Sequence, residues 1–276
     1  MLTKRLIYVT GLPRSGSTLL CQLLGQHSGL YSPGHSSPLC QTLVGLRQGL
    51  SDDPFLLSQM DLDYALVQQQ LLSAFRGFMS GWYGVAPQDA VVDKNRGWMH
   101  HLELLHLVDP DCRLLVCVRE LGQVWGSIEG QHHKTLLFDF VDHLAQLTPI
   151  DRADRLFAAD GVIGEPLRSL EAIQDRNAEL QSRLYYVVFE DLVSNPQEVM
   201  QGIYDWLGLP SVDFDPQNLS VHPTESDSHY RYKYPHHIRS AITPPLPHPV
   251  PPRINASLHR NFRWFYAMFY PGLLEG

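Results

Sequence analysis

The chain has 276 residues, of which 44% are hydrophobic and 18% charged, a composition typical of a soluble globular protein with a sizeable core. Its formal net charge of −8 argues against a broad nucleic-acid-binding surface, so an anionic ligand would need a local cluster of cations. We expect no membrane span, because no run of 18 apolar residues occurs, and no signal peptide. The four cysteines lack metal-site spacing, which favours a reduced, cytoplasmic protein.

The predicted strands are short and almost continuously apolar, as parallel strands covered on both faces are. They lie at residues 6–10, 90–92, 113–118 and 185–189. Helical patterns are found at residues 17–26, 63–78, 121–128, 195–207 and 258–269, the last with an aromatic stripe that we expect to pack in the core. Strands that alternate with helices predict a three-layer α/β fold of the P-loop type with a central parallel sheet, and we expect one domain over residues 1–276.

The segment GLPRSGST, from Gly11 to Thr18, follows the first strand and begins a helix. In this context a glycine-rich loop wraps its backbone N–H groups around an anion, and the helix N-terminus adds a positive dipole end. Ser17 stands where a nucleoside-triphosphate-binding loop has lysine, so Arg14 is the only cation in the loop. A planar guanidinium can hold two oxygens at once. The candidate ligand-binding residues of this loop are Arg14, Ser15, Gly16, Ser17 and Thr18.

This loop resembles that of the sulfotransferases that use 3′-phosphoadenosine 5′-phosphosulfate (PAPS). It is most similar to the G-x-P-R-S-G-[ST]-T-L segment of the tyrosylprotein sulfotransferases and related bacterial enzymes. The resemblance implies the sulfotransferase fold, a loop that binds the 5′-phosphosulfate, and an Arg14 that replaces the lysine. It also implies transfer of a sulfuryl group to a hydroxyl, with 3′,5′-adenosine bisphosphate (PAP) as the product. A sulfuryl group carries less charge than a γ-phosphoryl group, so we expect no metal site.

A second motif of that family is matched by Arg119, which ends the third strand, and Ser127, which lies eight residues further on in the next helix. In the family these two residues hold the 3′-phosphate of the cofactor. The closest relatives also carry an arginine four residues after the serine, where this chain has Gln131. Some of that charge must therefore come from elsewhere, and Lys134 and His132 are candidates.

Three further cofactor contacts follow from the resemblance. Lys94 follows the second strand, in a segment similar to one whose lysine contacts the transferring sulfuryl group. Phe189 stands where the family has a tyrosine against the cofactor, so packing can be retained but a hydroxyl contact cannot. Lys233 and Arg239 belong to a basic, aromatic stretch where the family has a loop that closes over the cofactor.

The acceptor hydroxyl needs a general base that titrates near the working pH. The tyrosylprotein enzymes place a glutamate shortly after the helix of the loop, but no carboxylate occurs here between Gly11 and Asp52. His35 occupies the matching position, and histidine titrates in the right range. The catalytic residues expected from the sequence are therefore His35, Lys94 and Arg14, with Asp93 or another histidine as the alternative base.

Two other functions are compatible with parts of the sequence. A small-molecule kinase that uses Mg-ATP could place Asp93 on the metal ion, although Ser17, Arg119 and Ser127 disfavour it. A non-catalytic nucleotide-binding module could use the proline-rich stretch 244–252 for interactions, although we expect that stretch to be an extended connector. The acceptor and the oligomeric state stay open, and the loops expected to face the acceptor lie within residues 31–60, 130–165 and 210–255.

Overall fold

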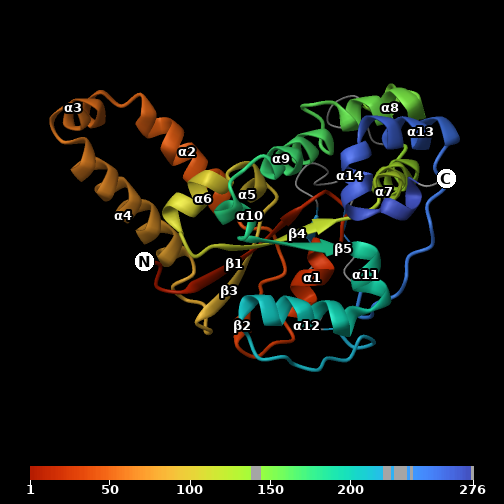
Figure 1. Ribbon diagram of the computed structural model, residues 1–276, viewed down its shortest axis with the longest axis horizontal. Helices are drawn as coiled ribbons and strands as arrows, with labels where there is room; N and C mark the ends of the chain where they lie inside the picture. Colours follow the sequence, from red (N-terminus) through yellow and green to blue (C-terminus); the bar gives the residue numbers. More distant parts are fainter. Residues whose placement is uncertain (138–143, 220–224, 227–234, 237–238, 275–276) are drawn as a thin grey trace.

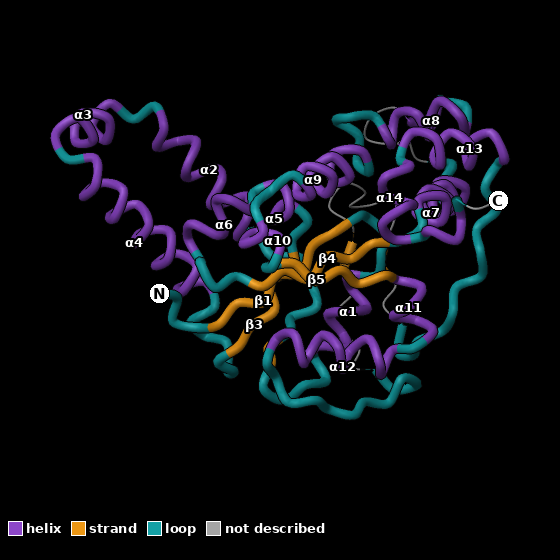
Figure 2. Tube along the Cα trace, in the orientation of Figure 1, coloured by secondary structure: helices purple, strands orange, loops and turns teal. Residues whose placement is uncertain are grey.

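A five-stranded parallel sheet lies at the centre of the computed structural model (Figure 1, Figure 2). The structure describes residues 1–137, 144–219, 225–226, 235–236 and 239–274. In spatial order the strands are β2 (Leu30–Tyr31), β3 (Ala90–Lys94), β1 (Arg5–Gly11), β4 (Arg113–Val118) and β5 (Leu184–Val188). This sheet confirms the predicted α/β fold, and β2 is an edge strand that the sequence did not predict.

The register of the central strands sets the position of the site. β1 pairs with β3 up to Val9 opposite Lys94, and with β4 up to Gly11 opposite Cys117. Because the strands are parallel, the loop after β1, Lys94 and the residue after β4 all lie at the carboxyl edge of the sheet. Ligands of open α/β sheets bind at this edge.

Helices cover both faces of the sheet and give it three layers (Figure 2). Leu6 and Tyr8 of β1 face one layer, and Ile7 and Val9 face the other, as the period of a strand requires. The second layer contains α1 (Ser17–Leu24), α11 (Phe189–Ser194) and α12 (Pro196–Leu207). The first layer contains α5 (Gly97–His100), α6 (Leu102–Val108), α7 (Leu121–Lys134), α8 (Pro149–Phe157), α9 (Gly164–Gln174), α10 (Ala178–Gln181), α13 (Pro252–Asn261) and α14 (Arg263–Phe269).

Three helices form an arm that projects from this body (Figure 1). They are α2 (Leu39–Ser51), α3 (Pro54–Leu62) and α4 (Tyr64–Trp82), so most of the 31–60 segment expected to be loop is helical. Aspartates cap the two later helices, since Asp53 accepts from the N–H of Leu56 and Asp63 from that of Leu66. Within the described part of the chain, no helix is long and apolar enough to cross a membrane.

The C-terminal aromatic stripe packs in the core, but not on one helix as predicted. The chain leaves helical geometry at Phe262, where φ is −120° and ψ is 37°, so α13 and α14 are separate. Leu258 and Phe265 are buried in the first layer, and Phe269 packs against it. Among the described residues, the other short elements are the 3₁₀ turns Leu144–Gln146 and Pro271–Leu273 and the strands β6 (Glu225–Ser226) and β7 (Pro235–His236).

All four cysteines, Cys21, Cys40, Cys112 and Cys117, are buried free thiols. Burial raises the pKa of Cys40 and of Cys112 to about 12, and Asp93 and Asp109 respectively add to the effect. These thiols are therefore protonated at neutral pH, and nucleophilic cysteine chemistry has no support in the fold.

Substitution of Gly11 tests the close approach of β1 and β4. Gly11 has a φ of 128°, and a Cβ there would lie 2.1 Å from the carbonyl oxygen of Cys117. We expect Gly11→Ala to lower the free energy of unfolding by about 3 kcal/mol or more, measured by urea denaturation. In α4, a Cβ at Gly77 would meet nothing within 4 Å. Gly77→Ala should therefore raise the free energy of unfolding by about 0.5–1 kcal/mol. Equal stability of the two variants would contradict the packing described.

Candidate functional site

A cavity of about 760 Å³ lies at the carboxyl edge of the sheet, and its charge is one-sided. None of the described residues that line it is Asp or Glu, although the chain as a whole carries a net charge of −8. Six cationic side chains line it: Arg14, Lys94, Arg96, Arg119, Lys134 and Arg239. A cavity whose charged side chains are all positive and whose other walls are apolar attracts a ligand with several negative charges.

The loop between β1 and α1 has a fixed conformation of its own. Gly11 and Gly16 have positive φ angles, and Arg14, at 60°, is the one non-glycine residue among those described that does. The Ser15 hydroxyl donates to the carbonyl of Leu12 at 2.6 Å, so it braces the loop instead of facing the cavity as a ligand contact would. Left-handed backbone at a residue with a Cβ costs about 1–2 kcal/mol and is found at functional sites.

The N-terminus of α1 points its free amide groups at this cavity. Gly16 is the N-cap, with a φ of 87°, and no side chain caps the helix. Ser17 and Thr18 are the first residues of the helix and line the cavity. Uncapped N–H groups of a first turn, with the positive end of the helix dipole, bind phosphate-like anions.

Lys94, the last residue of β3, reaches the same loop. Its Nζ donates to Thr18 Oγ1 at 3.1 Å. Arg96 follows two residues later and also lines the cavity, and its carbonyl accepts from the hydroxyl of Thr10 at 3.0 Å. The sequence reading missed Arg96, although a second cation so close to Lys94 at a strand end was a usable signal.

Asp93 points the opposite way from Lys94, because adjacent strand residues face opposite sides of a sheet. It is 0% exposed and accepts hydrogen bonds from the Tyr83 hydroxyl, at 2.8 Å, and from the Trp98 indole N–H. Burial raises the pKa of its carboxyl, and these hydrogen bonds oppose the rise. Asp93 therefore belongs to the core and lies outside the cavity, where it is in no position to hold a metal ion or to act as a base.

Arg14 and Arg119 join the loop to the start of α7. Arg14 Nε–H donates to Ser127 Oγ at 3.1 Å, and Arg119 Nη1–H donates to the Arg14 carbonyl at 3.1 Å. Arg119 is 6% exposed, and its buried Nε makes no hydrogen bond with any described residue, since Glu190 Oε1 is 4.0 Å away. Burial lowers the pKa of Arg119, Glu190 opposes this and Arg14 adds to it. An oxygen-rich anion would satisfy such a buried donor.

Phe189 connects Arg119 to the glycine-rich loop. The Arg119 guanidinium lies over its ring, 4.4 Å from the ring centre. On the loop side, a Cβ added at Gly16 would lie 2.5 Å from Phe189 Cδ2, so only glycine allows this contact. Phe189 also lines the cavity, where the sequence predicts that it packs against the cofactor.

The proline-rich stretch is part of the cavity wall and not only a connector. Residues 243–248, which we call the C-terminal strap, contribute Thr243, Pro244, Pro245, Leu246 and His248 to the lining. The strap is fastened to α7, because the side-chain amide of Gln123 donates to the His248 carbonyl and accepts from the His248 N–H. Prolines predict an extended backbone but not where it lies, so the sequence held no signal for this position.

Of the two basic residues expected in the C-terminal region, Arg239 lines the cavity. Its guanidinium donates to Thr243 Oγ1 at 2.6 Å, and the side-chain amide of Gln22 donates to the Arg239 carbonyl. Lys233 lies outside the described residues.

His35, the expected base, is exposed, and its Nδ1 lies 3.4 Å from the carbonyl oxygen of Ser36. Ser36 lines the cavity, whereas His35, the residue before it, is not among the described lining residues.

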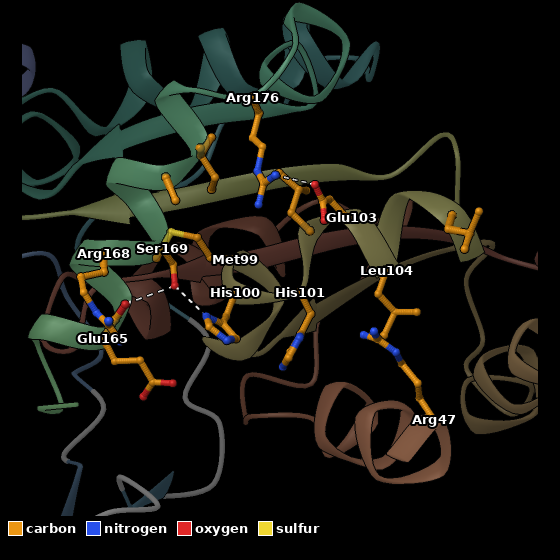
Figure 3. A pocket seen from close by; sticks show the side chains of 14 residues that line it. Arg47, Met99, His100, His101, Glu103, Leu104, Glu165, Arg168, Ser169 and Arg176 are labelled. Atoms are coloured by element: carbon orange, nitrogen blue, oxygen red, sulfur yellow. Dashed lines mark hydrogen bonds and ion pairs between the residues drawn. The ribbon is translucent and has the colours of Figure 1, made fainter. Parts of the chain in front are cut away.

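A second cavity, of about 540 Å³, lies between α2, α6 and α9 beside α5 (Figure 3). Its lining mixes both signs of charge. Arg176 forms an ion pair with Glu103 at 2.6 Å, and His100 Nδ1 lies 3.0 Å from Ser169 Oγ (Figure 3). The Ser169 hydroxyl in turn donates to the Glu165 carbonyl. None of these residues stood out in the sequence, because they come from two stretches that lie far apart in the chain, residues 100–103 and 165–176.

The structure is an α/β fold in which the glycine-rich loop between β1 and α1 borders a cavity lined by cationic side chains. The model of the sulfotransferase family matches residues 7–214, three quarters of the chain, so the protein belongs to that family and is a sulfotransferase. No curated protein sequence matches the chain.

Three solved structures share the fold. The sulfotransferase domain from the curacin biosynthetic pathway is 20% identical, with 95% of this chain and 99% of that chain covered and a TM-score of 0.53. The sulfotransferase domain from the Synechococcus PCC 7002 olefin synthase is 22% identical, with coverages of 95% and 96% and a TM-score of 0.51. A sulfotransferase from Alicyclobacillus acidocaldarius is 12% identical, with coverages of 100% and 97% and a TM-score of 0.56.

Substitution of Arg14 separates its backbone strain from its charge. Because only glycine adopts a φ of 60° without strain, Arg14→Gly should have a free energy of unfolding about 1 kcal/mol higher than Arg14→Ala. Both variants lack the guanidinium, so both should lose sulfotransferase kcat/KM by roughly 100-fold or more. Urea denaturation and initial rates measure the two effects. Equal stability of the two variants would show that the loop relaxes.

Proposed function

We propose that the protein transfers a sulfuryl group from PAPS to a hydroxyl of its acceptor and releases PAP. The observation that carries this proposal is the link between Arg14 and the Arg119–Ser127 pair, at hydrogen-bond distances of 3.1 Å. From it we infer two anion-binding positions in one cavity, one in the loop and one at Arg119 and Ser127. PAPS carries two separate anionic groups, a 5′-phosphosulfate and a 3′-phosphate.

The residues present fit such a ligand. The amides of Gly16, Ser17 and Thr18, with the side chains of Arg14 and Lys94, would hold the 5′-phosphosulfate. Arg119 and Ser127 would hold the 3′-phosphate, and the buried Nε of Arg119, which lacks a hydrogen bond, would gain an acceptor. Arg239 and Phe189 would border the nucleotide, as both line the cavity. All of these residues line the cavity.

The chemistry follows from where charge develops. PAPS supplies an activated sulfur, whose bond to the 5′-phosphate oxygen breaks as the acceptor oxygen forms its own bond to sulfur from the opposite side. Negative charge grows on the departing oxygen, and Arg14, Lys94 and the loop amides stabilise it because they are already in position. The acceptor hydroxyl gives its proton to a base, and His35 is our candidate.

A kinase has no comparable support in the site. The metal-binding role that it would need from Asp93 is not available, since both carboxylate oxygens face Tyr83 and Trp98 in the core. The resemblance to the tyrosylprotein enzymes lies in the cofactor motifs, whereas the acceptor is selected by the loops between the core elements. Tyrosine specificity is therefore no part of the proposal.

The donor is tested by a transfer assay with ³⁵S-labelled PAPS and a panel of phenols, alcohols, glycans and tyrosine peptides, in EDTA. We expect label in at least one acceptor, at a rate that added Mg²⁺ does not raise by more than about twofold, because cations of the protein stabilise the leaving group. A parallel assay with γ-labelled ATP and Mg²⁺ should give no transfer. Phosphoryl transfer to an acceptor, with none from PAPS, would refute the proposal.

The base is tested by His35→Ala, with His106→Ala as the matched control. His106 lies on α6 and contacts Glu179, away from the cavity. We expect kcat of His35→Ala to fall by about 100-fold with an unchanged Kd for PAP, because general-base catalysis contributes about 10²–10⁴-fold. The control should keep its kcat. Full turnover in His35→Ala would exclude His35 as the base.

A further inference from the structure

The C-terminal strap places a histidine in the part of the cavity formed by α7. A Cβ added at Gly126 would lie 2.4 Å from His248 Cβ, and one at Gly130 would lie 3.9 Å from His248 Nδ1. The His248 side chain therefore lies over the helical turn between these two glycines. Ser127 and Gln131, which both line the cavity, each follow one of them in sequence. The glycines leave the room that the imidazole occupies.

We propose that His248 binds the 3′-phosphate of the nucleotide together with Arg119 and Ser127. This inference rests on the proposed use of PAPS. It goes beyond the sequence, which offered Lys134 and His132 as sources of the charge that neutral Gln131 does not supply. His248 lines the cavity with Lys134, whereas His132 is 4% exposed and is not among the lining residues.

The charges around His248 make its contribution depend on pH. The groups that act on it are all cationic: Arg119 after β4, Arg14 in the loop and Lys134 in α7. The nearest acidic residue of α7, Glu129, is held by Arg152 at 2.7 Å, and Glu190 lies beside Arg119. Burial lowers the pKa of the His248 imidazole, and the three cations lower it further.

A phosphate bound beside this ring would reverse the effect. An anion favours the imidazolium, so the pKa of His248 rises when the nucleotide binds, and binding takes up a proton. The gain in affinity is present at a pH below the pKa of the complex and is lost as the pH rises through it. The ring nitrogens make no hydrogen bond with the described residues, so both can serve the ligand.

Calorimetric titration with PAP and with adenosine 5′-phosphate, which lacks the 3′-phosphate, tests this assignment. The proteins are wild type, His248→Gln, His248→Lys and the control His106→Gln, each at pH 6.5 and 8.5. We expect His248→Gln to weaken PAP binding about tenfold at pH 6.5 and less than about twofold at pH 8.5, relative to wild type at the same pH. His248→Lys should bind PAP tightly at both pH values. The affinity for adenosine 5′-phosphate should not differ between the proteins.

Because each variant is compared with wild type at the same pH, the effect of pH on the ionisation of the phosphate itself cancels. Equal PAP affinity in wild type and His248→Gln at pH 6.5, with PAP bound by both, would overturn the inference and leave the proposed function standing. An equal loss for adenosine 5′-phosphate would overturn the assignment to the 3′-phosphate. No binding of PAP by wild type at either pH would overturn the proposed function and this inference together.

Discussion

The hydrogen bonds of Arg14 hold the site together. Its side chain binds Ser127, 113 residues away in the sequence, and its carbonyl accepts from Arg119, 105 residues away. Arg14 makes these bonds with a left-handed φ of 60°, a conformation that costs about 1–2 kcal/mol. The sheet makes this possible, because Gly11 allows β1 to end directly against β4. The loop and the α7 site thus form one cavity.

That cavity has two chemically different ends. Lys94, Arg96 and Ser36 surround the end near β3, where charge would develop during transfer. The α7 end has Ser127 and the strap, and under the proposed function it holds the 3′-phosphate, which does not react. No described Asp or Glu lines either end. Under the proposed function, the nucleotide is anchored at the α7 end and the sulfuryl group is transferred at the end near β3.

Much of this could be read from the sequence, and the failures have physical causes. Apolar runs and the glycine-rich loop predicted β1, β3, β4 and β5, because buried parallel strands need that composition. The edge strand β2 has only two residues, which are too few to form a recognisable apolar run in the sequence. The alternation of strand residues already implied that Asp93 and Lys94 face opposite sides. By contrast, the place of the strap depends on contacts with α7, so no local pattern could reveal it.

A crystal structure with bound PAP tests the central claim most directly, because it shows the orientation of a ligand with two distinct phosphates. The account predicts the 5′-phosphate within hydrogen-bond distance of the Gly16, Ser17 and Thr18 amides. The 3′-phosphate should contact Arg119 and Ser127, with the His248 ring beside it. A nucleotide bound in the reverse direction, or with either phosphate outside the cation-lined cavity, would contradict it.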